Sequence, residues 1–94
     1  PNWATIRLSP WGLKEIEHMA PPYVRANLEL LGEPDALGWH TARLPVAHER
    51  MAVSEFLKLG TEVEVLDPPE LREAMRRAAH ALTERYAGPP AVTM

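Results

Sequence analysis

The four histidines of this sequence are the side chains most able to bind a transition metal or to transfer a proton near neutral pH. Metal-binding histidines usually stand at short, regular spacings from one another or from carboxylates. His18, His40, His48 and His80 follow no such spacing, and the chain has no cysteine that could complete a site. We therefore expect no metal site and no cofactor.

Nucleophilic chemistry finds no support in the sequence either. A catalytic serine needs a base beside it and commonly stands on a sharp strand-to-helix turn. Ser9 precedes Pro10 and is better explained as a helix cap, and Ser54 falls inside a predicted helix. Both glycine-rich phosphate-binding patterns, GxxxxGK[ST] and GxGxxG, are missing. We predict that the chain is not an enzyme and has no catalytic residues.

Arginine and aromatic side chains offer binding chemistry instead. Both are enriched at binding hot spots, and an arginine can hold a phosphate or a carboxylate with two hydrogen bonds. Alternation along the predicted strands places three of each on one sheet face, which we call the aromatic–arginine face. Its members are Trp3, Arg7, Tyr23, Arg25, Trp39 and Arg43. We predict that this face binds an effector or a partner, unless the last helix covers it.

Four segments have the two-residue period of half-buried strands: residues 3–8, 23–30, 39–46 and 61–66. Glycines and Pro34 in residues 32–38 predict a turn between the second and third strands. A helix should start at Ser9 and end before Pro21, and a second should span residues 48–59 and end at Gly60.

The last helix has the clearest start in the sequence. Asp67 is expected to cap it, the two following prolines need no intrahelical donor, and Glu70 completes a capping box. The helix continues to about residue 86 with an apolar stripe. The stripe residues that we predict to serve dimerisation are Met75, Leu82 and Tyr86.

The resulting order, βαββαβ followed by one more helix, predicts an α+β fold: a ferredoxin-like plait with an additional C-terminal helix. Hydrophobic residues make up 46% of the 94 residues and charged residues 24%, which suits one globular domain. We expect a single domain over residues 1–94, with its core at about 2–87 and a tail at 88–94.

The net charge of −3 argues against a general electrostatic grip on duplex DNA. No apolar run is long enough to span a membrane, and no signal peptide is visible. Together with the absence of cysteine, this favours a cytoplasmic protein without membrane contact. Because the chain starts at Pro1 rather than Met, we expect it to be the C-terminal part of a longer protein.

Residues 56–73, FLKLGTEVEVLDPPELRE, resemble the C-terminal extension, or WCX domain, of bacterial WYL-domain transcriptional regulators. The family pattern LGxxVEVLxPxELR matches here, and the following helix continues the resemblance to residue 86. Residues 1–46 agree in element order and in the hairpin. The resemblance implies a ferredoxin-like fold in a parent protein that also has a DNA-binding domain and a WYL domain.

For function, the resemblance implies a regulatory module that helps the parent to assemble, here as a homodimer, and to sense an effector. The resemblance also implies a nucleic-acid-like effector, such as single-stranded DNA or a nucleotide. The WYL tripeptide itself is absent from this chain. A complete effector site would therefore require the WYL domain as a partner.

Two other functions remain open. The sheet face could bind nucleic acid or a nucleotide directly, by stacking bases on its aromatic residues. Alternatively, Gly12 in the first strand–helix connection would suit a small-molecule sensor of the ACT type, which shares this plait. An acylphosphatase is rejected, because the first loop at residues 9–12 contains no arginine to cradle a phosphate.

Overall fold

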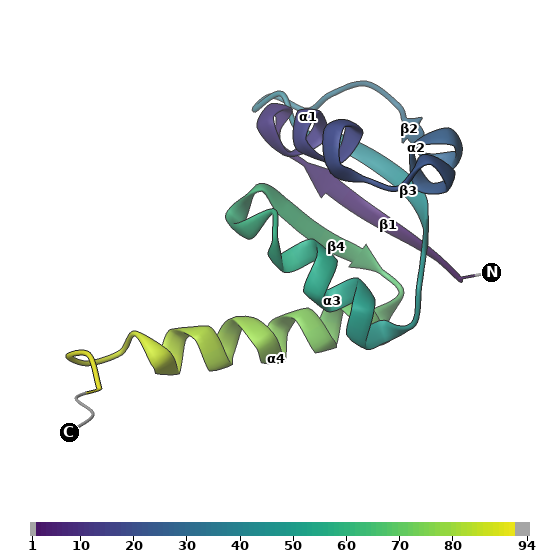
Figure 1. The fold of residues 1–94 in the computed structure, drawn as a ribbon. Coiled ribbons are helices and arrows are strands. Elements are labelled where there is room, and N and C mark those ends of the chain that lie inside the picture. Colours follow the sequence, from purple (N-terminus) through teal and green to yellow (C-terminus); the bar gives the residue numbers. More distant parts are fainter. Residues whose placement is uncertain (1, 92–94) are drawn as a thin grey trace.

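The computed structural model describes residues 2–91, so the last three residues of the predicted tail lie outside the described part. Figure 1 shows the arrangement of the helices and strands. In chain order the elements are β1 (Asn2–Leu8), α1 (Pro10–Met19), α2 (Pro22–Asn27), β2 (Glu29–Leu31), β3 (His40–Val46), α3 (Glu49–Leu57), a 3₁₀ turn η1 (Gly60–Glu62), β4 (Val63–Asp67) and α4 (Pro69–Arg85).

The four strands form one antiparallel sheet in the order β2-β3-β1-β4. This is the order of a ferredoxin-like plait, so the predicted α+β fold with a C-terminal helix is confirmed. In the central part of the sheet Ile6 of β1 lies between Ala42 of β3 and Val65 of β4. Strand alternation then sends all three side chains to the same face.

That face carries the hydrophobic core. Ile6 and Leu8 are completely buried, and helices α1, α3 and α4 contribute Ile16, Phe56 and Leu71 to the same cluster. Within residues 2–91 the side chains on the opposite face, among them Thr5, Arg7 and Arg43, are only half-buried, so this face is not covered by a helix layer. The sheet is therefore covered on one side and open on the other, as expected for this plait.

Ser9 is predicted to cap the first helix, and its side chain does cap it. The Ser9 hydroxyl accepts a hydrogen bond of 3.0 Å from the Gly12 amide, and donates one of 2.6 Å to Oε1 of Glu62. The Ser9 amide also donates to the Glu62 carbonyl at 3.1 Å. Ser9 is buried, so these bonds tie the start of α1 firmly to the turn before β4.

The second predicted strand is largely wrong. Residues 22–27 form helix α2, and β2 is reduced to Glu29–Leu31. Pro22 suits the first turn of a helix because it lacks an amide hydrogen and has a helical φ. Val24 and Leu28 pack against the core. Their spacing of four residues fits one face of a helix as well as it fits alternate positions of a strand.

The predicted capping box at the last helix is also wrong. Asp67 belongs to β4, where it lies opposite Thr5, and α4 begins at Pro69 after Pro68. No side chain caps this helix. β4 starts two residues later than expected, at Val63, because Gly60–Glu62 turn as a 3₁₀ helix. Gly60 has a left-handed φ of +60°, but it does not end the preceding helix as predicted, because α3 stops at Leu57 with Lys58 as its cap.

Helix α4 leaves the body of the domain after its first turns. It packs on α3 and β4 rather than across the open sheet face. Every residue from Ala79 to Arg85 is exposed, and the end of the helix projects away from the other elements (Figure 1). No helix among residues 2–91 has the length and apolar character needed to cross a bilayer.

Candidate partner and effector surfaces

The open sheet face has two arginine–tryptophan stacks, and the first joins β1 to β3. The guanidinium carbon of Arg43 lies 4.0 Å from the ring centre of Trp3, a cation–π contact. Nη1 of Arg43 is 3.8 Å from Oε2 of Glu29, which is longer than a hydrogen bond, and 41% of the Arg43 side chain and 58% of the Glu29 side chain are exposed. The stack therefore presents a flat surface whose guanidinium donors remain available to a ligand.

In the second stack the arginine is also fixed by two ion pairs. Arg7 lies 4.8 Å from the ring centre of Trp39, while its Nη1 bonds Glu64 at 2.9 Å and its Nη2 bonds Asp35 at 2.6 Å. The other oxygen of Glu64 accepts from Arg72 of α4 at 2.8 Å. Arg7 thus ties the loop before β3 and the start of α4 to the sheet, and its charge is already neutralised by two carboxylates.

These ion pairs lower the pKa of both carboxyl groups. The Arg7 guanidinium holds the pKa of Asp35 below its usual 3.8, helped by backbone amide donors. Arg72 and then Arg7 hold the pKa of Glu64 below its usual 4.5. A group with a depressed folded-state pKa stabilises the fold above its unfolded pKa, and that stabilisation is lost as the pH falls through the folded value.

We therefore expect the fold to lose stability as the pH drops below about 4.5, the range in which these carboxyl groups take up protons. The Glu64→Gln variant should lose less stability than the wild type between pH 6 and pH 3, because its residue 64 no longer titrates. Urea unfolding followed by circular dichroism across this range measures the effect, with Glu33→Gln in the exposed loop as the matched control. Equal acid sensitivity of the two variants would contradict the assigned role of Glu64.

The structure brings together four of the six residues predicted for the aromatic–arginine face: Trp3, Arg43, Arg7 and Trp39. The placement of Tyr23 and Arg25 on this face is wrong, because both belong to α2, where they are exposed. Sequence reasoning missed Asp35 and Arg72, which complete the Arg7 cluster. The distances in sequence, 28 residues from Arg7 to Asp35 and 8 from Glu64 to Arg72, hide these pairs.

The residues predicted for dimerisation fall in two different environments. Met75 packs against the core of its own chain. Leu82, in the projecting end of α4, is 47% exposed, and Tyr86, the residue directly after the helix, is 83% exposed. At about 100° per residue they lie on the same helix face as Leu71 and Met75. One apolar stripe therefore starts inside the domain and continues into solvent.

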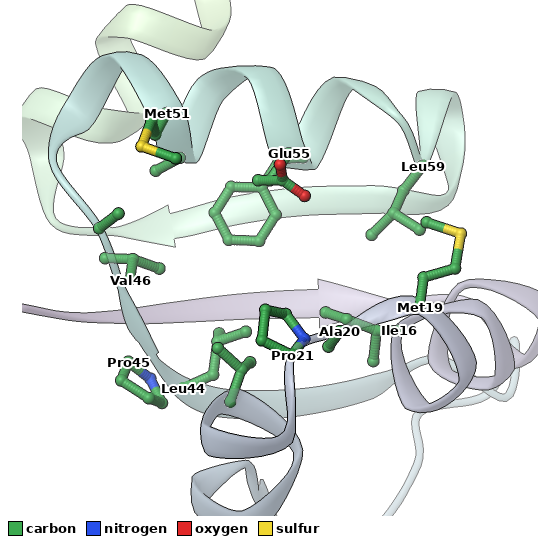
Figure 2. A pocket seen from close by; sticks show the side chains of 14 residues that line it. Ile16, Met19, Ala20, Pro21, Leu44, Pro45, Val46, Met51, Glu55 and Leu59 are labelled. Atoms are coloured by element: carbon green, nitrogen blue, oxygen red, sulfur yellow. The ribbon is translucent and has the colours of Figure 1, made fainter.

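An apolar groove that was not predicted from the sequence lies between the α1–α2 segment and α3. Its volume is about 270 Å³, and Figure 2 shows Pro21 across from Glu55, with Met19 beside Leu59 at one end and Met51 near Val46 at the other. Residues that line its inner wall include Leu44 and Phe56, both buried. Only the distance between helices creates such a groove, so residue patterns along the chain give no sign of it.

Within residues 2–91 no three histidine, aspartate or glutamate side chains lie close enough together to hold a metal ion. The geometry described above offers contact surfaces instead: a stacked tryptophan–arginine face, a projecting amphipathic helix and an apolar groove. These features suit recognition of a partner or of a flat, polar ligand.

Comparison with known proteins agrees with this picture. No curated protein matches the chain. The family model of the WCX domain, whose members have no catalytic activity, matches residues 1–83, nearly the whole of the described chain. The chain therefore belongs to the WCX domain family, the C-terminal extension of WYL-domain transcriptional regulators.

Proposed function

We propose that this WCX domain is the assembly and effector-sensing module of its parent regulator. In this role it links two copies of the regulator and works beside the WYL and DNA-binding domains of the same chain. The parent acts in the cytoplasm, and its effector is nucleic-acid-like. Two surfaces support the two parts of the role, the end of α4 for assembly and the open sheet face for sensing.

The observation that carries the proposal is the exposed continuation of the α4 stripe. The first half of the stripe is fully used, since Leu71 is only 3% exposed and Met75 packs on the core. The second half repeats the same spacing with Leu82 and Tyr86, which are 47% and 83% exposed. Leu82 lines a hollow with Leu57 and Met75 of its own chain, and much of its apolar surface still faces solvent. A large apolar side chain gains about 1.5–3 kcal/mol on full burial, so a partner surface would stabilise this end of the helix.

The assembly role predicts a concentration-dependent dimer that Leu82→Glu weakens by about tenfold or more, equal to 1.4 kcal/mol. The physical reason is that a carboxylate at this position must lose its hydration when the partner binds. Sedimentation equilibrium across a range of protein concentrations measures the dissociation constant. The matched control is His80→Glu, on the opposite side of the helix, which should leave the dimer intact. A strict monomer at all concentrations would refute the assembly role.

The open face supports the second part of the role. Bases stack readily on tryptophan and on arginine planes, and each stacked base contributes about 1–3 kcal/mol. Of the two stacks, Trp3 and Arg43 offer the freer guanidinium, because Arg7 is already bound by two carboxylates. We therefore place effector contact at Trp3 and Arg43, with Arg7 and Trp39 forming the rigid remainder of the face.

The sensing role predicts that Arg43→Ala in the parent regulator weakens binding of a fluorescein-labelled single-stranded oligo-dT by about fivefold or more. Fluorescence anisotropy at a fixed salt concentration measures this affinity. Arg25→Ala is the matched control, because Arg25 is an exposed arginine of α2 and lies off the face. Equal losses from both variants would indicate a general charge effect and would refute recognition by the face.

Direct binding of nucleic acid by the isolated domain is the second candidate function, and the same stacks favour it. It can be tested separately. The isolated domain should then bind the labelled oligonucleotide without the WYL domain, and Arg43→Ala should weaken that binding. The ACT-type alternative was suggested by Gly12 alone, and the structure explains this glycine by packing. Gly12 is needed for packing, because a Cβ there would lie 2.6 Å from the Glu62 carbonyl oxygen.

A further inference from the structure

We propose that Asp35 is a positioning residue of the open sheet face, and that it holds Trp39 in place as a second stacking surface for the effector. Both residues belong to the loop 32–39, which joins β2 to β3. The inference rests on the proposed sensing role. It adds to that role the residue that orients one of the two tryptophans, and the part of the ligand that this tryptophan receives.

Asp35 first shapes its own loop. Its Oδ1 accepts hydrogen bonds from the Leu37 amide at 2.9 Å and from the Trp39 amide at 3.0 Å. The Asp35 amide donates to the Trp39 carbonyl, and the Gly38 amide donates to the Asp35 carbonyl, both at 2.9 Å. Aspartate at the first position of a turn and glycine at the fourth are favoured residues for this geometry. One residue therefore fixes the backbone of Trp39 at both its amide and its carbonyl.

The second carboxylate oxygen of Asp35 fixes the arginine that lies against the Trp39 ring. Oδ2 accepts from Nη2 of Arg7 at 2.6 Å, and the guanidinium carbon of Arg7 lies 4.8 Å from the ring centre. Nη1 of Arg7 donates to Glu64 of β4 at 2.9 Å, so the guanidinium is held at both ends. Asp35 thus holds the backbone of Trp39 with one oxygen and the neighbour of its ring with the other.

This arrangement matters because burial does not order the loop. Residues 32–37 are all exposed, and Trp39 is half-buried. Immobilising a free side chain on binding weakens the affinity by about two- to tenfold, and a side chain that is already fixed avoids this loss. A tryptophan held by Asp35 is therefore a better stacking surface than the same ring on a loose loop.

The charges beside Trp39 indicate which part of a ligand it receives. Two arginines and two carboxylates form a balanced cluster there, with ion pairs of 2.6, 2.9 and 2.8 Å. At the first stack, Arg43 has instead a looser contact of 3.8 Å with Glu29. An anionic group of the ligand is therefore drawn to Arg43, whereas the flat surface at Trp39 suits an uncharged ring such as a base.

Asp35→Ala in the parent regulator separates positioning from a simple charge effect. The variant removes a carboxylate from a face that binds an anionic strand, so by charge alone it should strengthen binding. Loss of a fixed Trp39 should instead weaken the binding of fluorescein-labelled oligo-dT by about two- to tenfold in fluorescence anisotropy at fixed salt. Glu33→Ala, at an exposed position of the same loop, is the matched control and should bind at least as tightly as the wild type.

The hold on Trp39 can be measured directly in this chain by fluorescence. The chain has three tryptophans, so Trp3→Phe with Trp11→Phe leaves Trp39 as the single one. In this background Asp35→Ala should raise the rate constant of acrylamide quenching about twofold or more, because a ring that has lost its fixed neighbours is more mobile and accessible. Asp35→Asn keeps an oxygen that can accept from both loop amides, and should recover about half of this change or more. Both variants should retain the circular dichroism spectrum of the wild type.

Increased quenching together with weaker oligo-dT binding would support the proposal. Unchanged quenching in Asp35→Ala would overturn it, and so would unchanged or tighter binding, which would leave the sensing role intact without a contribution from Asp35. A wild-type regulator that does not bind oligo-dT, although Asp35→Ala still releases Trp39, would refute the sensing role and with it the use of Trp39 as a stacking surface.

Discussion

Ile6→Ala is expected to lower the free energy of unfolding by about 2–5 kcal/mol, a large part of the 5–15 kcal/mol typical of a domain. Ile6 is fully buried in the central strand of the sheet, and its neighbours across the strands are Ala42 and Val65. These residues are held in register by backbone hydrogen bonds, so the space left by the lost methylene and methyl groups cannot close. The cost therefore includes a cavity as well as lost burial.

Urea unfolding followed by circular dichroism gives this free energy. The slope of the free energy against urea concentration should stay unchanged if only stability is affected. The control is Thr5→Ala, one residue earlier in the same strand and directed toward the open face. It should cost about 1 kcal/mol or less, the usual effect of a surface change. Equal losses from the two variants would mean that the assignment of the two sheet faces is wrong.

Gly12→Ala is expected to destabilise the domain by about 1–3 kcal/mol, although alanine is the better helix former by about 1 kcal/mol. Gly12 lies in the first turn of α1, directly against the turn that precedes β4. A Cβ at this position would lie 2.6 Å from the carbonyl oxygen of Glu62, and backbone cannot move aside cheaply. The same carbonyl accepts from the Ser9 amide, so displacing it would also strain that contact.

Thermal and urea unfolding of Gly12→Ala measure this effect. Gly88→Ala serves as the control, because a Cβ there would meet no atom within 4 Å and its φ is not positive. The control should be neutral or slightly stabilising, since alanine restricts the unfolded chain. If Gly12→Ala were stabilising instead, helix propensity would dominate and the close approach of α1 to η1 would not restrict the fold.

The local sequence determined much of this protein. Residues 3–8 and 39–46 alternate so regularly that both the strands and the faces of Ile6, Arg7 and Arg43 could be predicted. Ser9-Pro10 predicted the helix start, because the hydroxyl and the proline act on neighbouring atoms. The pattern LGxxVEVLxPxELR indicated the family, which the WCX match confirms.

Tertiary contacts determined the structure of two segments for which the local pattern was ambiguous or misleading. Val24 and Leu28 satisfy a helix and a strand equally well, and packing against the core selected the helix, which moved Tyr23 and Arg25 off the sheet. Asp67 lost its predicted capping role because pairing with β1 extended β4 by one residue. In both cases contacts distant in sequence outweighed the local preference.

The surfaces proposed for function depend most strongly on tertiary structure. The apolar stripe of α4 was visible in the sequence, but its division into a buried half and an exposed half follows from where α3 and β4 end. The groove beside Met51 exists because α1 and α3 stand apart, and Arg7 meets Asp35 and Glu64 only after the sheet has formed. Hydrophobic period and capping act between near neighbours, whereas helix spacing and long-range ion pairs are set by the packing of the whole chain.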